Sequence, residues 1–219
     1  MVDRELIRAT ELFAGLDDAA LDRVLATART VELRRGDVIF EEGADPSHLY
    51  VVDDGRIALA SRSDDGRESV FALMERGDLF GEMPLLDGLG RSAEARALEP
   101  STVVEIAYEP VHEVFQAQPD LLWGVVRLLS LRLRNMDAAL ADSVFLDVTG
   151  RTAKRLLDMA DGEDEFTLPV TQEELAGMVG ASRERVNKAI ASFVRLGWID
   201  QTDRRYTILD REQLSRRAR

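Results

Sequence analysis

The stretch from residue 171 to residue 188, TQEELAGMVGASRERVNK, decides the fold of the C-terminal part of this chain. Thr171 and Glu174 have the spacing of a capping box, in which both side chains bond backbone N–H groups at the start of a helix. Gly180 can adopt the left-handed conformation that ends a helix in a sharp turn. Ser182 is a typical N-cap for the helix that follows. The stretch therefore predicts a helix-turn-helix.

The second helix of this motif has two chemically different faces. Val186, Ile190 and Phe193 recur at helical spacing and form an apolar face. The opposite face is charged, and arginine suits the O6 and N7 atoms of guanine while glutamate can accept from cytosine N4. A charged face is ordinarily only solvated, but the cap and the turn at the required offsets favour insertion into the major groove of DNA. We predict DNA contacts from Thr171, Gln172, Ser182, Arg183, Glu184, Arg185 and Lys188.

The residues after the second helix predict a β-hairpin with a basic tip. Gly197-Trp198-Ile199 and Tyr206-Thr207-Ile208 resemble its two strands, and Asp203-Arg204-Arg205 lies between them. A helix-turn-helix followed by such a hairpin is a winged module.

The distribution of charge agrees with contact between this end of the chain and DNA. The whole chain has 219 residues and a net charge of −13, which is unexpected for a DNA-binding protein. Residues 1–150 carry 15 Lys and Arg against 29 Asp and Glu, a net −14, whereas residues 181–219 carry 10 against 5, a net +5. The basic end can approach phosphates although the rest is acidic. The length also favours two domains.

Short β-rich runs follow one another from Val31 to Ala107. They include the runs 38–40 (VIF), 49–52 (LYVV), 57–60 (IALA) and 70–73 (VFAL). Asp54-Gly55 and Asp65-Gly66 between them are typical of tight hairpin turns. Strands at this spacing predict an antiparallel roll or jelly roll, with helices before it at about 17–28 and after it at about 109–117.

The segment from Asp120 to Phe145 predicts one long helix with a heptad seam. Its apolar residues step alternately by four and three positions, at Leu122, Val126, Leu129, Leu133, Met136 and Leu140. Charged side chains fall off the seam, which favours pairing with a copy of the same helix and therefore a homodimer. A single amphipathic helix packed on its own roll is the alternative. Asp147-Val148-Thr149-Gly150 then interrupts the pattern, and we expect a further helix at about 151–159.

The composition excludes several classes of protein. There is no cysteine, which excludes disulfides, thiolate catalysis, zinc fingers and cysteine-ligated iron–sulfur clusters. His48 and His112 are the only histidines, so we predict no metal and disfavour a haem sensor. No nucleophile–base arrangement or phosphate-binding loop of the NTPase type is evident, so we do not expect an enzyme. We expect a cytoplasmic protein with no membrane partner, because no apolar run reaches membrane-spanning length and no export signal is evident.

A second set of residues, within the predicted roll, suits an anionic ligand. The run 80–86, FGEMPLL, is followed by Arg91-Ser92-Ala93. Glycine in a short turn can direct backbone N–H groups at an anion, and an arginine with a hydroxyl can pair with a phosphate. Glu82 could accept from a sugar hydroxyl. Taken alone, an ordinary loop with a surface arginine would have the same residues.

These features together closely resemble the cyclic-AMP receptor protein family, also called catabolite activators, which includes the fumarate–nitrate regulator branch. The resemblance extends to the runs 145–151 (FLDVTGR) and 179–184 (VGASRE), and it is closest to actinobacterial members through the runs 171–174, 186–189 and 216–219. It implies an α+β fold with a cyclic-nucleotide-binding β-roll (jelly roll) at 1–119, a dimerisation helix at 120–146 and a winged helix-turn-helix domain at 147–219.

The resemblance also implies what each site residue does. Gly81, Glu82 and Met83 would hold the ribose side, with Glu82 accepting from the 2′-hydroxyl, and Arg91 and Ser92 would hold the cyclic phosphate. Arg183, Glu184 and Lys188 would read bases, although the best-known members more often have arginine where Lys188 stands. The family resemblance implies a dimeric transcriptional regulator that binds double-stranded DNA at a palindromic site similar to TGTGA…TCACA, responds to cyclic AMP and contacts RNA polymerase.

The chain departs from the family on the long helix. Cyclic-AMP binders of the family place a small polar pair against the adenine amino group, whereas this chain has Met136 and Asp137, which we assign to the base together with Arg132. Asp137 could accept from the adenine amine, or it could pair with N1 and N2 of guanine. Cyclic AMP is therefore the first expectation and cyclic GMP the alternative. A ligand-independent regulator with a degenerate pocket is the third possibility.

Overall fold

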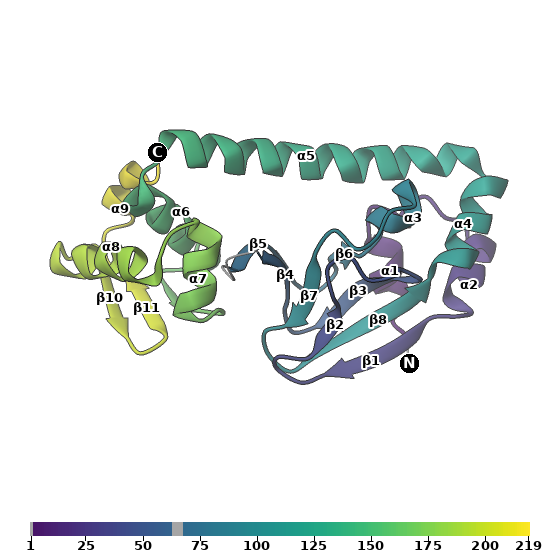
Figure 1. The fold of residues 1–219 in the computed structure, drawn as a ribbon, viewed down its shortest axis with the longest axis horizontal. Helices are drawn as coiled ribbons and strands as arrows, with labels where there is room; N and C mark the ends of the chain where they lie inside the picture. The colour runs from purple at the N-terminus through teal and green to yellow at the C-terminus, as the bar shows by residue number, and fades with distance from the viewer. Residues whose placement is uncertain (1, 63–67) are drawn as a thin grey trace. The chain divides into compact units, whose positions relative to one another are not determined.

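Two antiparallel sheets form the β-roll that the sequence predicts, in a computed structural model that describes residues 2–62 and 68–219 (Figure 1). One sheet has the strand order β1-β8-β3-β6 and the other the order β2-β7-β4-β5. The strands are β1 (Arg29–Leu33), β2 (Val38–Phe40), β3 (His48–Asp54), β4 (Ile57–Arg62), β5 (Glu68–Met74), β6 (Leu79–Phe80), β7 (Glu94–Ala97) and β8 (Ser101–Ala107). The predicted turn at Asp54-Gly55 joins β3 to β4, whereas the one predicted at Asp65-Gly66 lies outside the described residues.

Strand β3 shows why this part of the chain has continuous apolar runs. It pairs with β8 so that Val51 lies opposite Val104 and Val52 opposite Val103. Because side chains alternate between the two faces of a strand, Val52 and Val103 pack in the core inside the roll, while Val51 and Val104 pack against helices. Both faces of β3 are therefore buried, and an uninterrupted apolar sequence fits such a strand.

Helices flank the roll close to the predicted positions. They are α1 (Arg4–Ala9), α2 (Asp18–Leu25), α3 (Met83–Asp87), α4 (Tyr108–Ala117) and a 3-10 turn η1 (Pro119–Leu121). Helix α2 begins where expected because the Asp17 side chain accepts from the backbone N–H of Ala20 at 2.7 Å, but it ends at Leu25, before the predicted end near residue 28. Helices α1 and α3 were not predicted, since each is too short for an apolar period to show.

The long helix α5 (Leu122–Phe145) matches the predicted span, apart from the first two residues, which belong to η1. The chain divides into two compact units, Met1–Ser61 with Ala72–Arg134 and Arg62–Phe71 with Asn135–Arg219. The predicted domain limits at 119/120 and 146/147 stay predictions.

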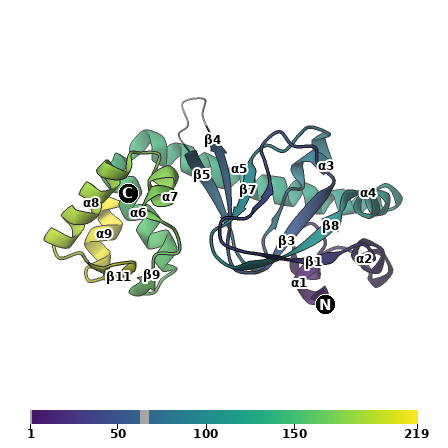
Figure 2. The ribbon, with the colours of Figure 1, turned by 60° about the horizontal axis from the view of Figure 1, so that its bottom comes forward.

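The second unit contains the predicted helix-turn-helix and hairpin. Its further elements are α6 (Val148–Ala160), β9 (Glu165–Thr167), α7 (Gln172–Val179), α8 (Arg183–Arg195), β10 (Ile199–Thr202), β11 (Arg205–Ile208) and α9 (Arg211–Arg217). Helix α6 begins at Val148 rather than near Arg151, because Asp147 caps it by accepting from Gly150 N–H at 2.8 Å. Figure 2 shows the four helices as one group beside the small sheet β10-β11-β9. The α+β architecture that the resemblance implies is confirmed.

Candidate functional site

The turn between α7 and α8 has the capping box and the left-handed glycine that its sequence predicts. Glu174 N–H donates to Thr171 Oγ1 at 3.2 Å and Thr171 N–H donates to Glu174 Oε2 at 2.6 Å, which completes the capping box. Gly180 then adopts φ +67°, a left-handed value that a side chain would disfavour. Ser182 stands at the predicted N-cap of α8, but its side chain makes no cap hydrogen bond among the described residues. The backbone turn, rather than a serine cap, starts this helix.

Helix α8 presents the predicted charged face to solvent. Val186, Ile190 and Phe193 are buried against the rest of the unit, while Arg183 and Arg185 are exposed at the N-terminal end. Neither arginine has an ion-pair or hydrogen-bond partner among the described residues, so both guanidinium groups are available to base edges or phosphates.

Glu184 and Lys188 lie on the same exposed face and bond each other. Lys188 Nζ donates to Glu184 Oε1 at 2.7 Å, one helical turn apart, and this bond lowers the pKa of Glu184. To contact DNA bases, Glu184 and Lys188 would have to break this ion pair. The loss in free energy is small, because ion pairs between exposed side chains contribute little.

Thr171 and Gln172, both predicted to contact DNA, also have structural partners. Thr171 belongs to the capping box, and Gln172 Nε2 donates to the hydroxyl of Tyr206 at 2.9 Å. Tyr206 belongs to β11 and stacks on Phe166 with ring centroids 5.6 Å apart. Gln172 thus ties the start of α7 to the wing, and DNA contact by these two residues stays a prediction.

In the roll, Arg91 is the centre of the candidate ligand site. It is buried, and its guanidinium lies 4.0 Å from the ring centroid of Phe40. Nη1 donates to the Gly81 carbonyl at 2.8 Å, and Nη2 donates to the His48 carbonyl at 2.7 Å. Nε is buried and has no partner in the described part of the chain. An unpartnered buried N–H of a cation is a strong site for an anion.

Glu82 lies fully buried in the same roll and is paired with Arg132 of α5. Arg132 donates to Glu82 Oε1 and, through Nη2, to the Leu79 carbonyl at 2.8 Å. Burial raises the pKa of Glu82, while the charges of Arg132 and Arg91 oppose this. Oε2 of Glu82 is buried and without a partner among the described residues. The carboxylate can therefore accept one further hydrogen bond, and a ligand hydroxyl is a suitable donor.

The remaining residues predicted for the ligand are more exposed. Ser92 Oγ lies 3.6 Å from the sulfur of Met83, and both side chains are accessible to solvent. Gly81 has φ +77°, and a Cβ added there would lie 2.8 Å from Arg91 Nη1. A side chain at this position would displace the arginine. Met136 and Asp137 are exposed on α5, and their contact with a base stays a prediction.

The sequence reasoning did not identify Phe40 and Tyr108, which contact Arg91. Phe40 packs against the guanidinium, and the Tyr108 hydroxyl accepts from Arg91 Nη1 at 3.0 Å. They are 51 and 17 residues from Arg91 in the chain. No local spacing signal connects residues that only the strand pairing brings together.

The six residues predicted for a dimer seam are all exposed on α5. Val125 and Leu128 face the core of their own unit, with 6% and 5% exposed, whereas Leu133 and Met136 on the seam are 60% and 68% exposed. The other seam residues are Leu122, Val126, Leu129 and Leu140, all exposed. The alternative in which this stripe packs on its own roll does not fit, because a different face of α5 does so.

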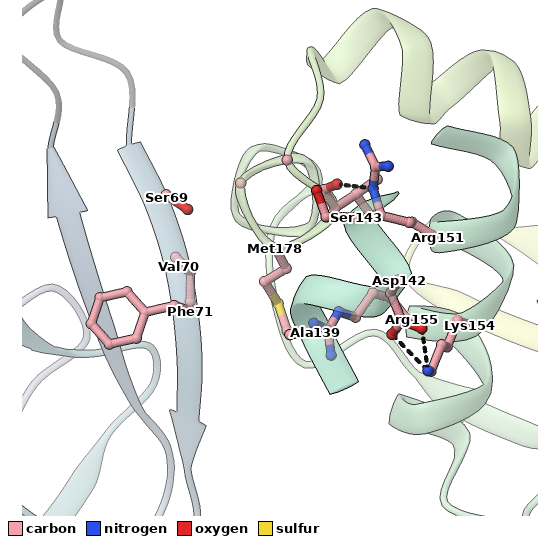
Figure 3. Close-up of a pocket in the computed structure, with 13 residues that line it drawn as sticks. Ser69, Val70, Phe71, Ala139, Asp142, Ser143, Arg151, Lys154, Arg155 and Met178 are labelled. Carbon is pink, nitrogen blue, oxygen red and sulfur yellow. Dashed lines mark hydrogen bonds and ion pairs between the residues drawn. The ribbon is translucent and has the colours of Figure 1, made fainter. Parts of the chain in front are cut away.

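The joint between α5 and α6 is held by polar contacts within the second unit. Arg151 donates from Nη1 to the Leu146 carbonyl at 2.7 Å and from Nε to the Val179 carbonyl at 2.8 Å, so it links the end of α5 to the end of α7. Figure 3 shows Arg151 and, nearby, the ion pair between Lys154 and Asp142 at 2.6 Å. These carbonyls at helix ends would otherwise lack partners.

Helix α9, which the sequence reasoning did not predict, covers the start of α6. The Arg217 guanidinium bonds both carboxylate oxygens of Asp147. The Gly150 N–H and then Arg217 lower the pKa of Asp147. A Cβ added at Gly150 would lie 3.0 Å from the Arg217 carbonyl oxygen. The glycine at this position therefore allows the close approach of α9 to α6, because a Cβ would press on the Arg217 backbone.

We expect Gly150→Val to destabilise the second unit by about 1–3 kcal/mol, because the larger side chain has to push away the backbone of α9. Thermal unfolding of the full chain measures this. Arg155→Val is the control, because it introduces valine at a partly exposed position of the same helix. It measures the effect of the low helix propensity of valine alone. Equal melting temperatures for the two variants would contradict the close packing of α9.

The described residues contain no group of three or more His, Asp or Glu side chains placed to hold a metal ion. Over residues 2–62 and 68–219, no helix has both the length and the apolar character needed to cross a membrane.

Comparison with known proteins covers both units. Residues 30–118 match the family described as "Cyclic nucleotide-binding domain", and residues 150–217 match the "Crp-like helix-turn-helix domain". The chain is 34% identical over 222 residues to the "CRP-like cAMP-activated global transcriptional regulator" of Mycobacterium tuberculosis, with 98% of this chain and 99% of that protein covered.

Two solved structures are similar along most of the chain. One is the regulator CLP of Xanthomonas campestris, described as c-di-GMP responsive, with 26% identity, a TM-score of 0.75 and coverage of 88% of this chain and 99% of that one. The other is a transcriptional regulator of the CRP/FNR family from Thermus thermophilus, with 27% identity, a TM-score of 0.72 and coverage of 87% and 98%. These proteins are regulators, in agreement with the prediction that the chain is not an enzyme.

Proposed function

Since the chain belongs to the cyclic-AMP receptor protein family of transcriptional regulators, we propose that it binds a palindromic DNA site as a homodimer and that cyclic AMP in the β-roll controls this binding. The observation that carries the ligand part is a pair of buried polar atoms without partners in the described chain, Arg91 Nε and Glu82 Oε2. One is a cationic donor and the other an anionic acceptor. A ligand that carries both a phosphate and a hydroxyl suits this pair.

A cyclic nucleotide fits this donor set. Its phosphate oxygens can accept from Arg91 Nε, and its ribose hydroxyl can donate to Glu82 Oε2. Both contacts would form where neighbouring atoms exclude water, since Arg91 and Glu82 are buried. Charge-assisted hydrogen bonds in such surroundings are stronger than in solvent. The phosphate and the ribose together account for both unpartnered atoms.

The choice of base in the proposed cyclic nucleotide depends on the name of a relative and on the side chain of Asp137. The relative from Mycobacterium tuberculosis is named as cAMP-activated, and this supports cyclic AMP. Asp137 could accept from the amino group of adenine or from the N1 and N2 groups of guanine, so cyclic GMP is the alternative. Arg132 and Met136 complete the proposed base contacts.

The exposed face of α8 supports the DNA part of the proposal. Arg183 and Arg185, which have no partner among the described residues, stand in its first turn, with Glu184 and Lys188 beside them. The exposed seam of α5 supports the homodimer, because two copies would bring two recognition helices to successive major grooves. The ligand would act by favouring the dimer geometry with the right spacing. As a DNA-binding regulator, the protein would work in the cytoplasm and contact RNA polymerase.

Isothermal titration calorimetry of the full chain with cyclic AMP, cyclic GMP and cyclic di-GMP tests the ligand assignment. We expect cyclic AMP to bind most tightly and Arg91→Gln to weaken it about ten- to a hundredfold, because hydrogen bonds to a charged group contribute about 1.5–3 kcal/mol. Arg76→Gln removes a guanidinium from the surface of the same unit and controls for the loss of charge.

Three outcomes of the titration would count against this assignment. If none of the three nucleotides gave a measurable heat of binding, the ligand proposal would be wrong. Equal affinity of the wild type and Arg91→Gln would move the site elsewhere. Tightest binding of one of the two guanine nucleotides would overturn the choice of base. Melting temperatures of each variant separate a loss of binding from a loss of folding.

A further inference from the structure

The guanidinium of Arg91 has five N–H donors, and three of its hydrogen bonds go to the protein itself. Nη1 bonds the Gly81 carbonyl and the Tyr108 hydroxyl, at 2.8 and 3.0 Å, and Nη2 bonds the His48 carbonyl at 2.7 Å. These bonds fix the plane of the group and leave Nε, together with one N–H of Nη2, for a ligand. The orientation of the guanidinium therefore decides whether the N–H groups of Nε and Nη2 can bind an anion in a bidentate manner.

Tyr108 is the only side chain among the described residues that hydrogen-bonds this guanidinium. Its hydroxyl accepts from Arg91 Nη1 and at the same time donates to the Gly81 carbonyl, so the three groups form a closed triangle. Burial raises the pKa of Tyr108 to about 12. The hydroxyl thus keeps its proton at neutral pH and can donate to the carbonyl.

The position of Tyr108 in the fold makes it a rigid support. It is the first residue of α4, directly after β8, and its backbone N–H donates to the Ser47 carbonyl at 3.0 Å. Its side chain reaches Gly81, where a positive φ turns the chain, and a Cβ there would lie 2.8 Å from Nη1. Tyr108 therefore connects the β8–α4 junction to the turn that precedes Glu82.

We propose that Tyr108 is a positioning residue that holds Arg91 in the orientation required to bind the anionic group of the ligand, an inference that rests on the proposed function. The hydroxyl acts through Arg91 and does not itself contact the ligand. Without it, the guanidinium is held by the Gly81 and His48 carbonyls and by the ring of Phe40, and it loses the only side-chain hydrogen bond that the described residues give it. A tilt of the guanidinium within this smaller set of contacts would turn Nε away from the ligand.

Tyr108→Phe tests this role with a change of one hydroxyl. We expect the affinity for cyclic AMP, measured by calorimetry on the full chain, to fall about tenfold, the effect of one hydrogen bond to a charged group. Tyr50→Phe is the matched control, because it removes a hydroxyl from another tyrosine of the same roll, one that is buried. That hydroxyl donates to Glu105 at 3.2 Å and does not bond Arg91. The affinity of Tyr50→Phe should match that of the wild type.

The double variant Tyr108→Phe/Arg91→Gln separates positioning from a merely structural effect. If Tyr108 acts through Arg91, the added Tyr108→Phe change costs nothing further in the Arg91→Gln background. The same tenfold loss in both backgrounds would overturn the inference, as would wild-type affinity for Tyr108→Phe alone. Failure of the wild type itself to bind any of the three nucleotides would instead overturn the proposed function, so the two failures are distinguishable.

Discussion

Leu133→Asp is expected to convert the protein to a monomer and to weaken binding to a palindromic DNA site on the order of a thousandfold. The substitution acts twice in a symmetric dimer, because the same residue lies on both copies of the helix. It would place a carboxylate in an apolar interface, where an unpaired charge is strongly unfavourable. Loss of the second recognition helix then removes the gain from simultaneous binding of two half-sites, which is typically a hundred- to ten-thousandfold.

The geometry of α5 is the basis for this expectation. Its Val125 and Leu128 face is buried in its own unit, whereas Leu133 is 60% exposed and lies on the seam with Val126 and Leu129. Asn135→Asp adds the same charge two residues away, at an exposed position off the seam, and should leave the dimer intact. Sedimentation velocity gives the oligomeric state, and fluorescence anisotropy with a labelled palindrome gives the DNA affinity. A Leu133→Asp variant that sediments as a dimer would contradict the proposed interface.

The parts of the fold that depend on neighbouring residues could be predicted from the sequence. The capping box at Thr171 and Glu174 and the turn at Gly180 involve residues within ten positions of one another, and the chemistry of each alone limits the backbone to a few conformations. The heptad steps of α5 are likewise a local pattern. This pattern predicts the exposed stripe, because side chains at a fixed spacing along a regular helix lie on the same face of it.

The parts that depend on distant residues could not be predicted in the same way. The motif around Glu82 predicts that it contacts the ligand. Its partner Arg132 lies 50 residues away in the chain. From the sequence we place Arg132 against the base of the ligand, and no local pattern indicates this ion pair. The contact of Arg217 with Asp147 spans 70 residues and depends on α9, a helix of seven residues that has little apolar period of its own. Such contacts follow from the packing of whole elements, which no spacing within one segment determines.

Gln172 shows the same limit within a well-predicted motif. Its position beside the capping residue gave a reasonable prediction of DNA contact. The bond from its amide to Tyr206, 34 residues away, gives it a second role in holding the wing. Neighbouring residues of one motif can therefore have different functions, and only the tertiary partners show which side chains are still available.

The second large effect is expected for Arg183→Ala, which should cost about 1–3 kcal/mol for each base pair read and about twice that in a dimer with two half-sites. Arg183 stands in the first turn of α8, where a recognition helix meets base edges. Its guanidinium is exposed and makes no bond to another described residue, so the substitution removes no folding contact. Loss of DNA affinity can then be attributed to DNA contact.

The comparison of specific with non-specific DNA distinguishes base reading from attraction to phosphate. A base-reading arginine affects the specific site alone, whereas a phosphate contact weakens binding to all sequences and reduces its salt dependence. Arg216→Ala on α9 removes an exposed arginine that is paired with Glu212 at 2.6 Å, and it controls for the change in net charge. Anisotropy titrations on both DNAs at several salt concentrations measure the two effects. If Arg183→Ala weakened binding equally on both DNAs, Arg183 would be a phosphate contact, and sequence reading would rest on Arg185, Glu184 and Lys188.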